Sequence, residues 1–162
     1  MKHKLKLGIL LVILLAVMAA IFLFSAQSAE ESKTLSNGLL DRLGKYLSFL
    51  PWFRADAGNR IRKLAHFAEF SCLGLASFLF FGELFFFGKE RLRCIFAYSS
   101  VFCFLYSCSD EIHQIFVPGR SCEWKDILID SSGALLGIFT AWLFVYLLNG
   151  KAGNSNHEDT SP

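Results

Sequence analysis

The chain has 162 residues, 54% of them hydrophobic and only three of them proline, and a formal net charge of +2 at neutral pH. This length allows one domain, and the apolar composition excludes a disordered chain and favours a protein with several membrane spans. With so small a net charge and no basic patch among the aromatic residues, we expect no nucleic-acid partner.

The first predicted element is a membrane span over residues 7–24, an uncharged apolar run behind a basic flank of residues 1–6. A spanning helix needs about 20 apolar residues, with a lower limit near 17. A cleaved signal peptide is the alternative, because residues 26–28 (Ala-Gln-Ser) fit a small-residue cleavage site. The run is longer than the usual signal h-region of about 7–15 residues, so we expect it to be retained as an anchor.

Residues 25–59 form the longest polar stretch before the end of the chain and predict an amphipathic helix on the membrane surface. Ser28 and Glu31 have the spacing of a capping box. Apolar residues then recur at helical spacing up to Pro51: Leu35, Leu39, Leu43, Tyr46 and Leu50. A short soluble helix folded over the spans fits the same pattern.

The second predicted span covers residues 62–87, and two ionisable residues interrupt its apolar character, His66 and Glu69. They are three residues apart, and Lys63 lies three residues before His66, so all three share one face of a helix. Ionisable side chains within a span are costly and indicate a functional site.

The third predicted span covers residues 92–109, and a Pro-Gly break at residues 118–119 follows it. Three of the five cysteines of the chain lie in this span, and four of the five lie in apolar runs. Without a CxxC pair they indicate neither a zinc site nor a disulfide framework. We expect them to be small, buried hydrophobic side chains.

The fourth predicted span covers residues 127–148. One face of its beginning carries two carboxylates followed by two glycines: Asp126, Asp130, Gly133 and Gly137. Glycine on such a face lets a neighbouring backbone approach closely. Residues 149–162 are small and polar, and we expect them to form a disordered tail.

The orientation in the membrane is not decided by the positive-inside rule, because the 16 Lys and Arg residues divide almost evenly between the two sides. The charge that flanks the first span usually dominates. Because Lys2, Lys4 and Lys6 precede this span, we expect the N-terminus to be cytoplasmic. The polar end of the bundle would then face outward.

The polar residues of the spans fall into two groups, one at the start of the second span and one between residues 109 and 137. In an up-down bundle of four helices both groups lie at the same end. They have three interpretations, the first being a network of buried ion pairs that only fixes the packing. The second is a ligand-binding site built from Lys63, Gln114, Arg120, Asp126 and Asp130. The third is a catalytic site with acid–base residues His66, Glu69, Asp110, Glu111 and His113.

Arg120 is the cation of the central stretch, and it follows the Pro-Gly break. We expect the break to turn its side chain toward Glu111, Asp126 and Asp130. The planar fork of a guanidinium suits phosphate or carboxylate, which a lysine cannot hold in the same bidentate way.

A polar cavity is expected around His66 and Glu69, with Asp110 and Glu111 on its wall, because an isolated charge that faces lipid is costly. The pair His66-x-x-Glu69 is only half of the HExxH zinc motif. The sequence therefore predicts no metal site, and it identifies no cofactor.

Three blocks of residues occur in a fixed order: Arg62-Lys63-x-x-His66-Phe67-x-Glu69-Phe70, Ser109-Asp110-Glu111-x-His113-Gln114-x-Phe116-x-Pro118-Gly119-Arg120, and Asp126-x-x-x-Asp130-x-x-Gly133-x-x-x-Gly137. Together they resemble the VanZ-like family of small bacterial polytopic membrane proteins, which is named for a member associated with teicoplanin resistance. That family commonly has Asn at the position of Asp130, so a carboxylate here replaces an amide. The resemblance implies a membrane fold in the bacterial cytoplasmic membrane and a role in the cell envelope.

We therefore expect an all-α membrane protein with four transmembrane helices and an amphipathic interfacial helix after the first. Its expected function is to bind or modify an anionic lipid-linked or glycopeptide-type ligand at the membrane surface, with a role in teicoplanin-type resistance. The expected partners are the lipid bilayer and an anionic lipid or cell-wall precursor. The alternatives are an intramembrane hydrolase or transferase that uses the His/Asp/Glu cluster, and a non-catalytic accessory membrane subunit.

Overall fold

Four long helices form the protein in the computed structural model, which describes residues 1–28, 30–32, 34–35, 38, 57–85 and 91–154. The helices are α1 (Lys2–Ser25), α4 (Ala57–Leu84), α5 (Leu92–Gln114) and α6 (Trp124–Asn154). Each is long and apolar enough to cross a membrane. The prediction of an all-α protein with four spanning helices is therefore confirmed.

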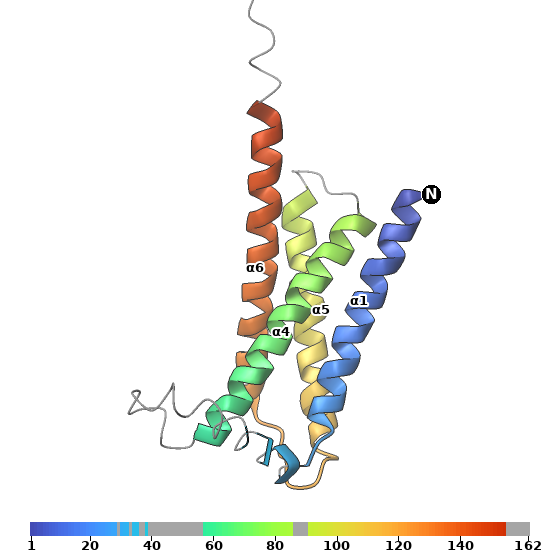
Figure 1. Cartoon of the computed structure of the whole chain (residues 1–162). Helices are drawn as coiled ribbons and strands as arrows, with labels where there is room; N and C mark the ends of the chain where they lie inside the picture. Colours follow the sequence, from blue (N-terminus) through green and yellow to red (C-terminus); the bar gives the residue numbers. More distant parts are fainter. Residues whose placement is uncertain (29, 33, 36–37, 39–56, 86–90, 155–162) are drawn as a thin grey trace, which may run out of the picture.

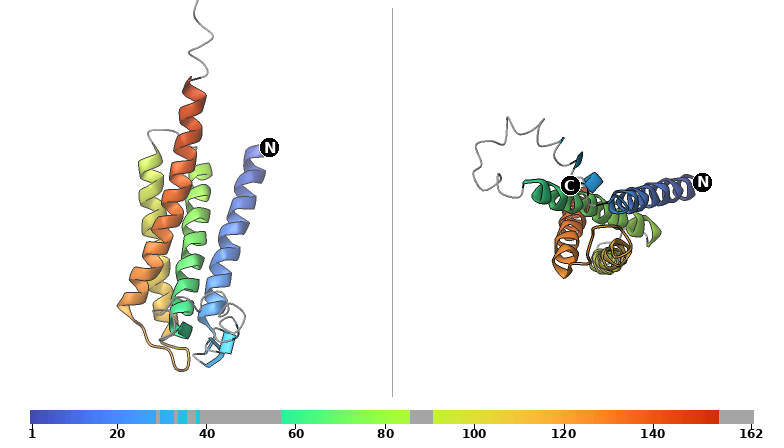
Figure 2. Two further views of the ribbon diagram at one scale, coloured as in Figure 1. Left: turned by 60° about the vertical axis from the view of Figure 1, so that its left-hand side comes forward. Right: turned by 90° about the horizontal axis from the view of Figure 1, so that it is seen from below.

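The helices form an up-down bundle in which α1 and α5 run in one direction and α4 and α6 in the other (Figure 1). The N-terminus and the far end of α6 lie at the same end of the bundle. α4 packs against all three other helices and most extensively against α6, whereas α1 and α5 touch each other little. Figure 2 shows from two further sides how α4 lies among its neighbours.

All four helices extend beyond the predicted spans at one end or both, and α4 begins at Ala57 and ends at Leu84 where we expected residues 62–87. α5 continues past residue 109 to Gln114, because polar side chains do not end a helix and the first breaker is Pro118. α6 continues to Asn154, so the first residues of the predicted tail are helical. No proline interrupts that stretch, and its helical hydrogen bonds carry on.

The segment after α1 is described only in part. Ser28 and Glu31 form the predicted capping box, in which the backbone N–H of Ser28 donates to Glu31 Oε2 at 2.9 Å and the N–H of Glu31 donates to Ser28 Oγ at 3.3 Å. The first of these bonds lowers the pKa of the Glu31 carboxyl. Most of the predicted interfacial helix, at residues 39–56, lies outside the described residues.

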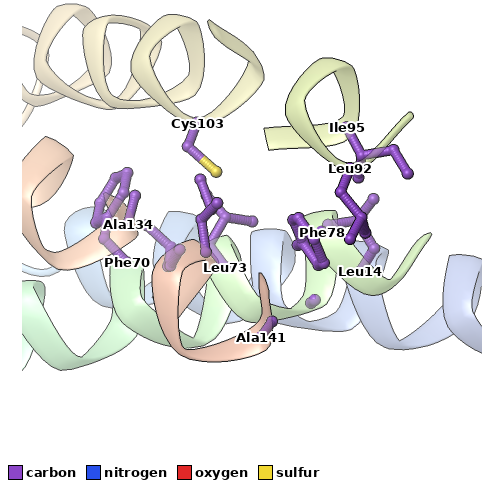
Figure 3. Close-up of a cluster of buried hydrophobic side chains, with 12 residues drawn as sticks. Leu14, Phe70, Leu73, Phe78, Leu92, Ile95, Cys103, Ala134 and Ala141 are labelled. Carbon is purple, nitrogen blue, oxygen red and sulfur yellow. The ribbon is translucent and has the colours of Figure 1, made fainter. Parts of the chain in front are cut away.

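Apolar side chains from all four helices meet in the core (Figure 3). The fully buried ones include Phe70, Leu73 and Phe78 of α4. Large apolar side chains such as Phe104 and Phe144 are instead exposed on the outside of the bundle. Soluble proteins rarely expose apolar surface on this scale, and a bilayer would cover it.

The prediction that the cysteines are buried is wrong for most of them. Cys103 is buried, Cys108 is half-buried, and Cys72, Cys94 and Cys122 are exposed. In a membrane protein an apolar run faces lipid as well as the core, so apolar sequence neighbours do not imply burial. Desolvation, followed by the nearby Glu111 carboxylate, raises the pKa of the Cys122 thiol.

Three glycines bring α4 and α6 into backbone contact, which confirms the prediction for the glycines of the fourth span. A Cβ added at any of them would overlap a carbonyl oxygen of the facing helix. The facing pairs are Gly133 and Phe67, Gly137 and Ser71, and Gly74 and Ala134. The close approach fixes the relative height of two parallel helices, and hence which polar residues face each other nearer the site.

α1 is tied to its neighbours by polar contacts at the end remote from the polar clusters and along its length. Lys6 Nζ lies 2.6 Å from Glu83 Oε2, and His3 Nε2 lies 3.4 Å from Glu83 Oε1. Glu83, next to the last residue of α4, is buried. Further along the helix, the Tyr106 hydroxyl donates to the Met18 carbonyl at 2.7 Å.

Candidate functional site

The two polar groups of the sequence meet at one end of the bundle, where α1 and α5 end and α4 and α6 begin (the lower end in Figure 1). α4 contributes the predicted face of Lys63, His66 and Glu69. The up-down order of the helices brings these residues to the same end as the carboxylates of α5 and α6, as the sequence predicted.

The parallel helices α4 and α6 face each other with complementary charges. Lys63 Nζ lies 2.5 Å from Asp126 Oδ1 and 3.9 Å from Glu123 Oε2. One turn further in, His66 Nδ1 lies 3.9 Å from Asp130 Oδ1. Lys63 and His66 are three residues apart on α4, and Asp126 and Asp130 are four residues apart on α6, so both pairs lie along one line of contact between the helices. The glycine contacts continue this line, and the same packing of α4 on α6 therefore sets the polar pairs and the glycine contacts.

The carboxylates of α5 are buried and held by neutral donors. Asp110 is 4% exposed, and its Oδ2 accepts bonds of 2.9 Å from both Ser25 Oγ and Gln114 Nε2. Glu111 is 1% exposed and accepts from Gln114 Nε2 at 3.1 Å and from the backbone N–H of Glu123 at 2.9 Å. Neutral donors orient these oxygens but do not cancel their charge.

Arg120 does not reach the carboxylates that we expected it to contact. Its Nη1 donates to Gln114 Oε1 at 3.2 Å, and its Nη2 donates to the Phe24 carbonyl at 3.4 Å. The turn before it depends on Gly119, whose φ of 76° suits glycine. This turn points Arg120 across the bundle toward α1, away from α6. Burial, then the nearby Arg62, lowers the pKa of the guanidinium.

A cavity of about 310 Å³ opens beside this network. His66 and Glu69 line it as predicted, and Arg62 and Arg120 lie on the same wall. Asp110 and Glu111 were also predicted as wall residues, but both are buried and neither lines the cavity. The remaining lining consists of four apolar side chains, Phe24, Leu35, Ile61 and Ala65, and two polar ones, Gln27 and Ser32. Glu69 Oε2 is buried without a hydrogen-bond partner among the described residues.

His113 lies apart from the other candidates. Its ring stacks on Phe22 of α1, with 4.3 Å between the ring centroids. It does not line the cavity. The predicted catalytic set is therefore divided, with His66 and Glu69 at the cavity and His113 in the contact between α1 and α5.

The family model VanZ/LLP1 matches residues 10–145, a range that includes all of α4 and α5, most of α1 and α6, and every polar residue of this site. The chain belongs to the VanZ/LLP1 family. No curated protein and no solved structure matches it. The suspected resemblance is thereby confirmed, and the apolar helices together with the family make this chain a multi-pass membrane protein.

The structure of this VanZ/LLP1 family member adds three residues, Ser25, Arg62 and Ser107, to those predicted as catalytic or ligand-binding. Ser25 and Ser107 each donate to a buried aspartate, Ser107 to Asp130 at 3.3 Å. Arg62 is a second cation on the cavity wall. The sequence does not show that a serine in an apolar run contacts a carboxylate. A helical serine can equally donate its hydroxyl hydrogen bond to a backbone carbonyl of its own helix.

Three residues of the VanZ/LLP1 site lie close enough together to be ligands of one metal ion. One donor atom each from His66, Asp110 and Asp130 lies within 4.8 Å of the others. The sequence predicted no metal site, since the three come from three helices and form no local motif. Chemically, the site therefore combines two cations on a partly apolar cavity wall with a buried group of carboxylates and one imidazole.

Proposed function

We propose that the protein binds the anionic headgroup of a membrane lipid or a lipid-linked cell-envelope precursor in the cavity beside Arg120. One observation carries the proposal: Arg62 and Arg120 line the same cavity as Phe24, Ile61 and Leu35. An amphiphile with a phosphate and a hydrocarbon chain needs both kinds of surface at one place. Belonging to the VanZ/LLP1 family is consistent with a ligand of the cell envelope.

The state of Arg120 supports an oxyanion as the ligand. Its two terminal nitrogens are held by Gln114 and by the Phe24 carbonyl, so the guanidinium is fixed in place. Its Nε is buried and has no hydrogen-bond partner among the described residues. A buried donor without an acceptor is costly, and a phosphate oxygen would satisfy it with a charge-assisted bond.

The remaining parts of the proposal concern location. We place the protein in the bacterial cytoplasmic membrane with its N-terminus in the cytoplasm, so that the cavity faces outward. A bound cell-wall precursor would be withheld from a glycopeptide antibiotic on that face, and this would account for a role in teicoplanin-type resistance.

Lipid selectivity tests the proposal. The protein is reconstituted in an equimolar mixture of phosphatidylglycerol and phosphatidylcholine, re-extracted in mild detergent, and its retained lipid is counted by native mass spectrometry. We expect the wild-type protein to retain phosphatidylglycerol, and Arg62→Gln/Arg120→Gln to lose this preference. Arg93→Gln removes an exposed arginine at the start of α5, at the other end of the bundle, and should keep it.

Equal retention of the two lipids by the wild-type protein would refute the proposal, as would an equal loss in Arg93→Gln. Inorganic phosphate added during extraction identifies the part of the ligand that is recognised. Displacement by phosphate shows that the headgroup alone suffices, and resistance to it shows that the hydrocarbon chain contributes.

A second function, hydrolysis or group transfer on the bound headgroup, is favoured by Glu69. Its Oε2 is buried at the cavity without a hydrogen bond, and His66 lines the same wall. A positioned general base contributes about 10²–10⁴-fold to a rate. If Glu69 is that base, Glu69→Gln should lower headgroup release from radiolabelled phosphatidylglycerol at least about 100-fold and leave lipid retention unchanged. Undiminished release would exclude this role, and a non-catalytic accessory subunit would show neither release nor selective retention.

A further inference from the structure

His66, Asp110 and Asp130 converge from three helices on one point inside the bundle. One donor atom of each lies within 4.8 Å of the other two. The two aspartates are 4% and 1% exposed, and the His66 side chain is 15% exposed. Three potential ligands on three helices, all turned toward one another, are held in place by the packing of the bundle and not by a flexible loop.

Asp130 is the least satisfied member of this group. Its Oδ2 accepts a long bond of 3.3 Å from Ser107, and its Oδ1 is buried with no hydrogen-bond partner among the described residues. The distance of 3.9 Å from Oδ1 to His66 Nδ1 is too long for a hydrogen bond. A buried carboxylate that is neither paired nor fully hydrogen-bonded is strongly destabilising.

The side-chain nitrogens of three nearby cations, Lys63, Arg62 and Arg120, contact groups other than the two aspartates. Arg62 Nη2 donates to Asn59 Oδ1 at 3.0 Å. Lys63 pairs with Asp126 one turn before Asp130, and the terminal nitrogens of Arg120 bond Gln114 and the Phe24 carbonyl. Two buried aspartates therefore face His66 without a lysine or arginine of their own. A doubly charged cation between the three side chains would balance both carboxylates.

We propose that His66, Asp110 and Asp130 bind a divalent metal ion. Imidazole with carboxylates is a donor set that suits Zn²⁺ or Mn²⁺. Metal–ligand bonds of about 2.0–2.2 Å in tetrahedral coordination place two donors about 3.3–3.6 Å apart. Donor atoms that lie up to 4.8 Å apart must therefore approach one another by at most about 1.5 Å, through side-chain rotation, to close the site. Three protein ligands leave further coordination positions open, as catalytic metal sites do.

The surrounding hydrogen bonds have the arrangement that a metal site needs. Ser25 and Gln114 hold one oxygen of Asp110, and Ser107 holds one oxygen of Asp130. Each carboxylate thus keeps its second oxygen for the ion, while neutral donors fix its orientation, which is the usual function of groups behind metal ligands. The ion site goes beyond the lipid-binding function and does not depend on it.

Manganese binding tests the proposal on the full-length protein in detergent. Metal-free protein is titrated with MnCl₂, and free Mn²⁺ is measured by electron paramagnetic resonance; competition with ZnCl₂ follows. We expect one Mn²⁺ per wild-type chain, displaced by Zn²⁺. Loss of a ligand in His66→Gln or Asp130→Asn should weaken binding at least about tenfold. The controls His113→Gln and Glu83→Gln change an imidazole stacked on Phe22 and a buried carboxylate at the other end of the bundle, both outside the group, and should bind as the wild-type protein does.

Melting temperatures keep the test decisive if a variant is poorly folded. Mn²⁺ or Zn²⁺ should raise the melting temperature of the wild-type protein and of both controls, because an ion that binds only the folded state stabilises it. The same ion should leave the melting temperature of Asp130→Asn nearly unchanged. The proposal is overturned if the wild-type protein binds neither ion, or if all four variants bind equally. It is also overturned if Asp130→Asn melts higher than a wild-type protein that does not respond to metal, because Asp130 would then be an unpaired or protonated carboxyl.

Discussion

Arg120→Lys should leave the helices intact and weaken the retention of phosphatidylglycerol roughly 10- to 150-fold. The guanidinium is held through both terminal nitrogens and still has Nε free for a ligand. A lysine ammonium carries the same charge but cannot keep those two bonds and also offer a fixed third donor. The loss of one hydrogen bond to a charged group costs about 1.5–3 kcal/mol, which corresponds to the stated factor at about 1.4 kcal/mol per tenfold.

Native mass spectrometry of the retained lipid measures this effect, with Arg93→Lys at the opposite end of the bundle as the control. The melting temperature of Arg120→Lys should stay close to that of the wild-type protein. If Arg120→Lys retains lipid fully while Arg120→Gln melts at a much lower temperature, then Arg120 only joins α5 and α1. The ligand-binding proposal would then lose its main residue.

Of the substitutions described here, we expect Gly137→Leu to lower the free energy of unfolding the most. A Cβ alone would overlap the Ser71 carbonyl oxygen of α4, which is backbone and cannot move aside without moving the helix. Overpacking of this kind costs about 1–3 kcal/mol and occasionally more, and a leucine should reach the upper end or exceed it. Because the glycine contacts fix the distance between α4 and α6, the Lys63–Asp126 pair should weaken as well.

Thermal unfolding in detergent measures this prediction, and Gly8 of α1 provides the control. A Cβ at Gly8 would meet nothing within 4 Å. Gly8→Leu should therefore be neutral or slightly stabilising, since glycine within a helix costs about 0.5–1 kcal/mol relative to alanine. Equal melting temperatures for the two leucine variants would show that the bundle tolerates a wider spacing of α4 and α6.

The helices and the end of the bundle that holds the polar residues could be predicted from the sequence. Long apolar runs are a strong signal because a bilayer sets their length. The face shared by Lys63, His66 and Glu69 follows from helical periodicity, and the surface at Gly137 that admits a neighbouring backbone follows from the small size of glycine. These are local properties of one helix, and they survive whatever the helix packs against.

The sequence could not predict which partner each polar side chain has. The contacts of Arg120 depend on the conformation of the turn at Gly119 and on the residue at which α5 ends, and the sequence pattern determined neither of these. The convergence of His66, Asp110 and Asp130 depends on the relative heights of three helices, which no spacing along the chain encodes. Exposure of the cysteines was mispredicted for a related reason, because apolar sequence does not distinguish a core face from a lipid face.

The polar attachments of α1 also have a mechanical consequence. They occur at three heights: Glu83 near its start, the Tyr106 hydroxyl further along, and Asp110 and Arg120 at its end. A helix held at three heights cannot slide along its axis or rotate about it without breaking the contacts at all three heights. The carbonyl that steadies Arg120 is therefore held at a constant depth, and a change in bilayer thickness should tilt the whole bundle as one body instead of shifting α1 against the cavity.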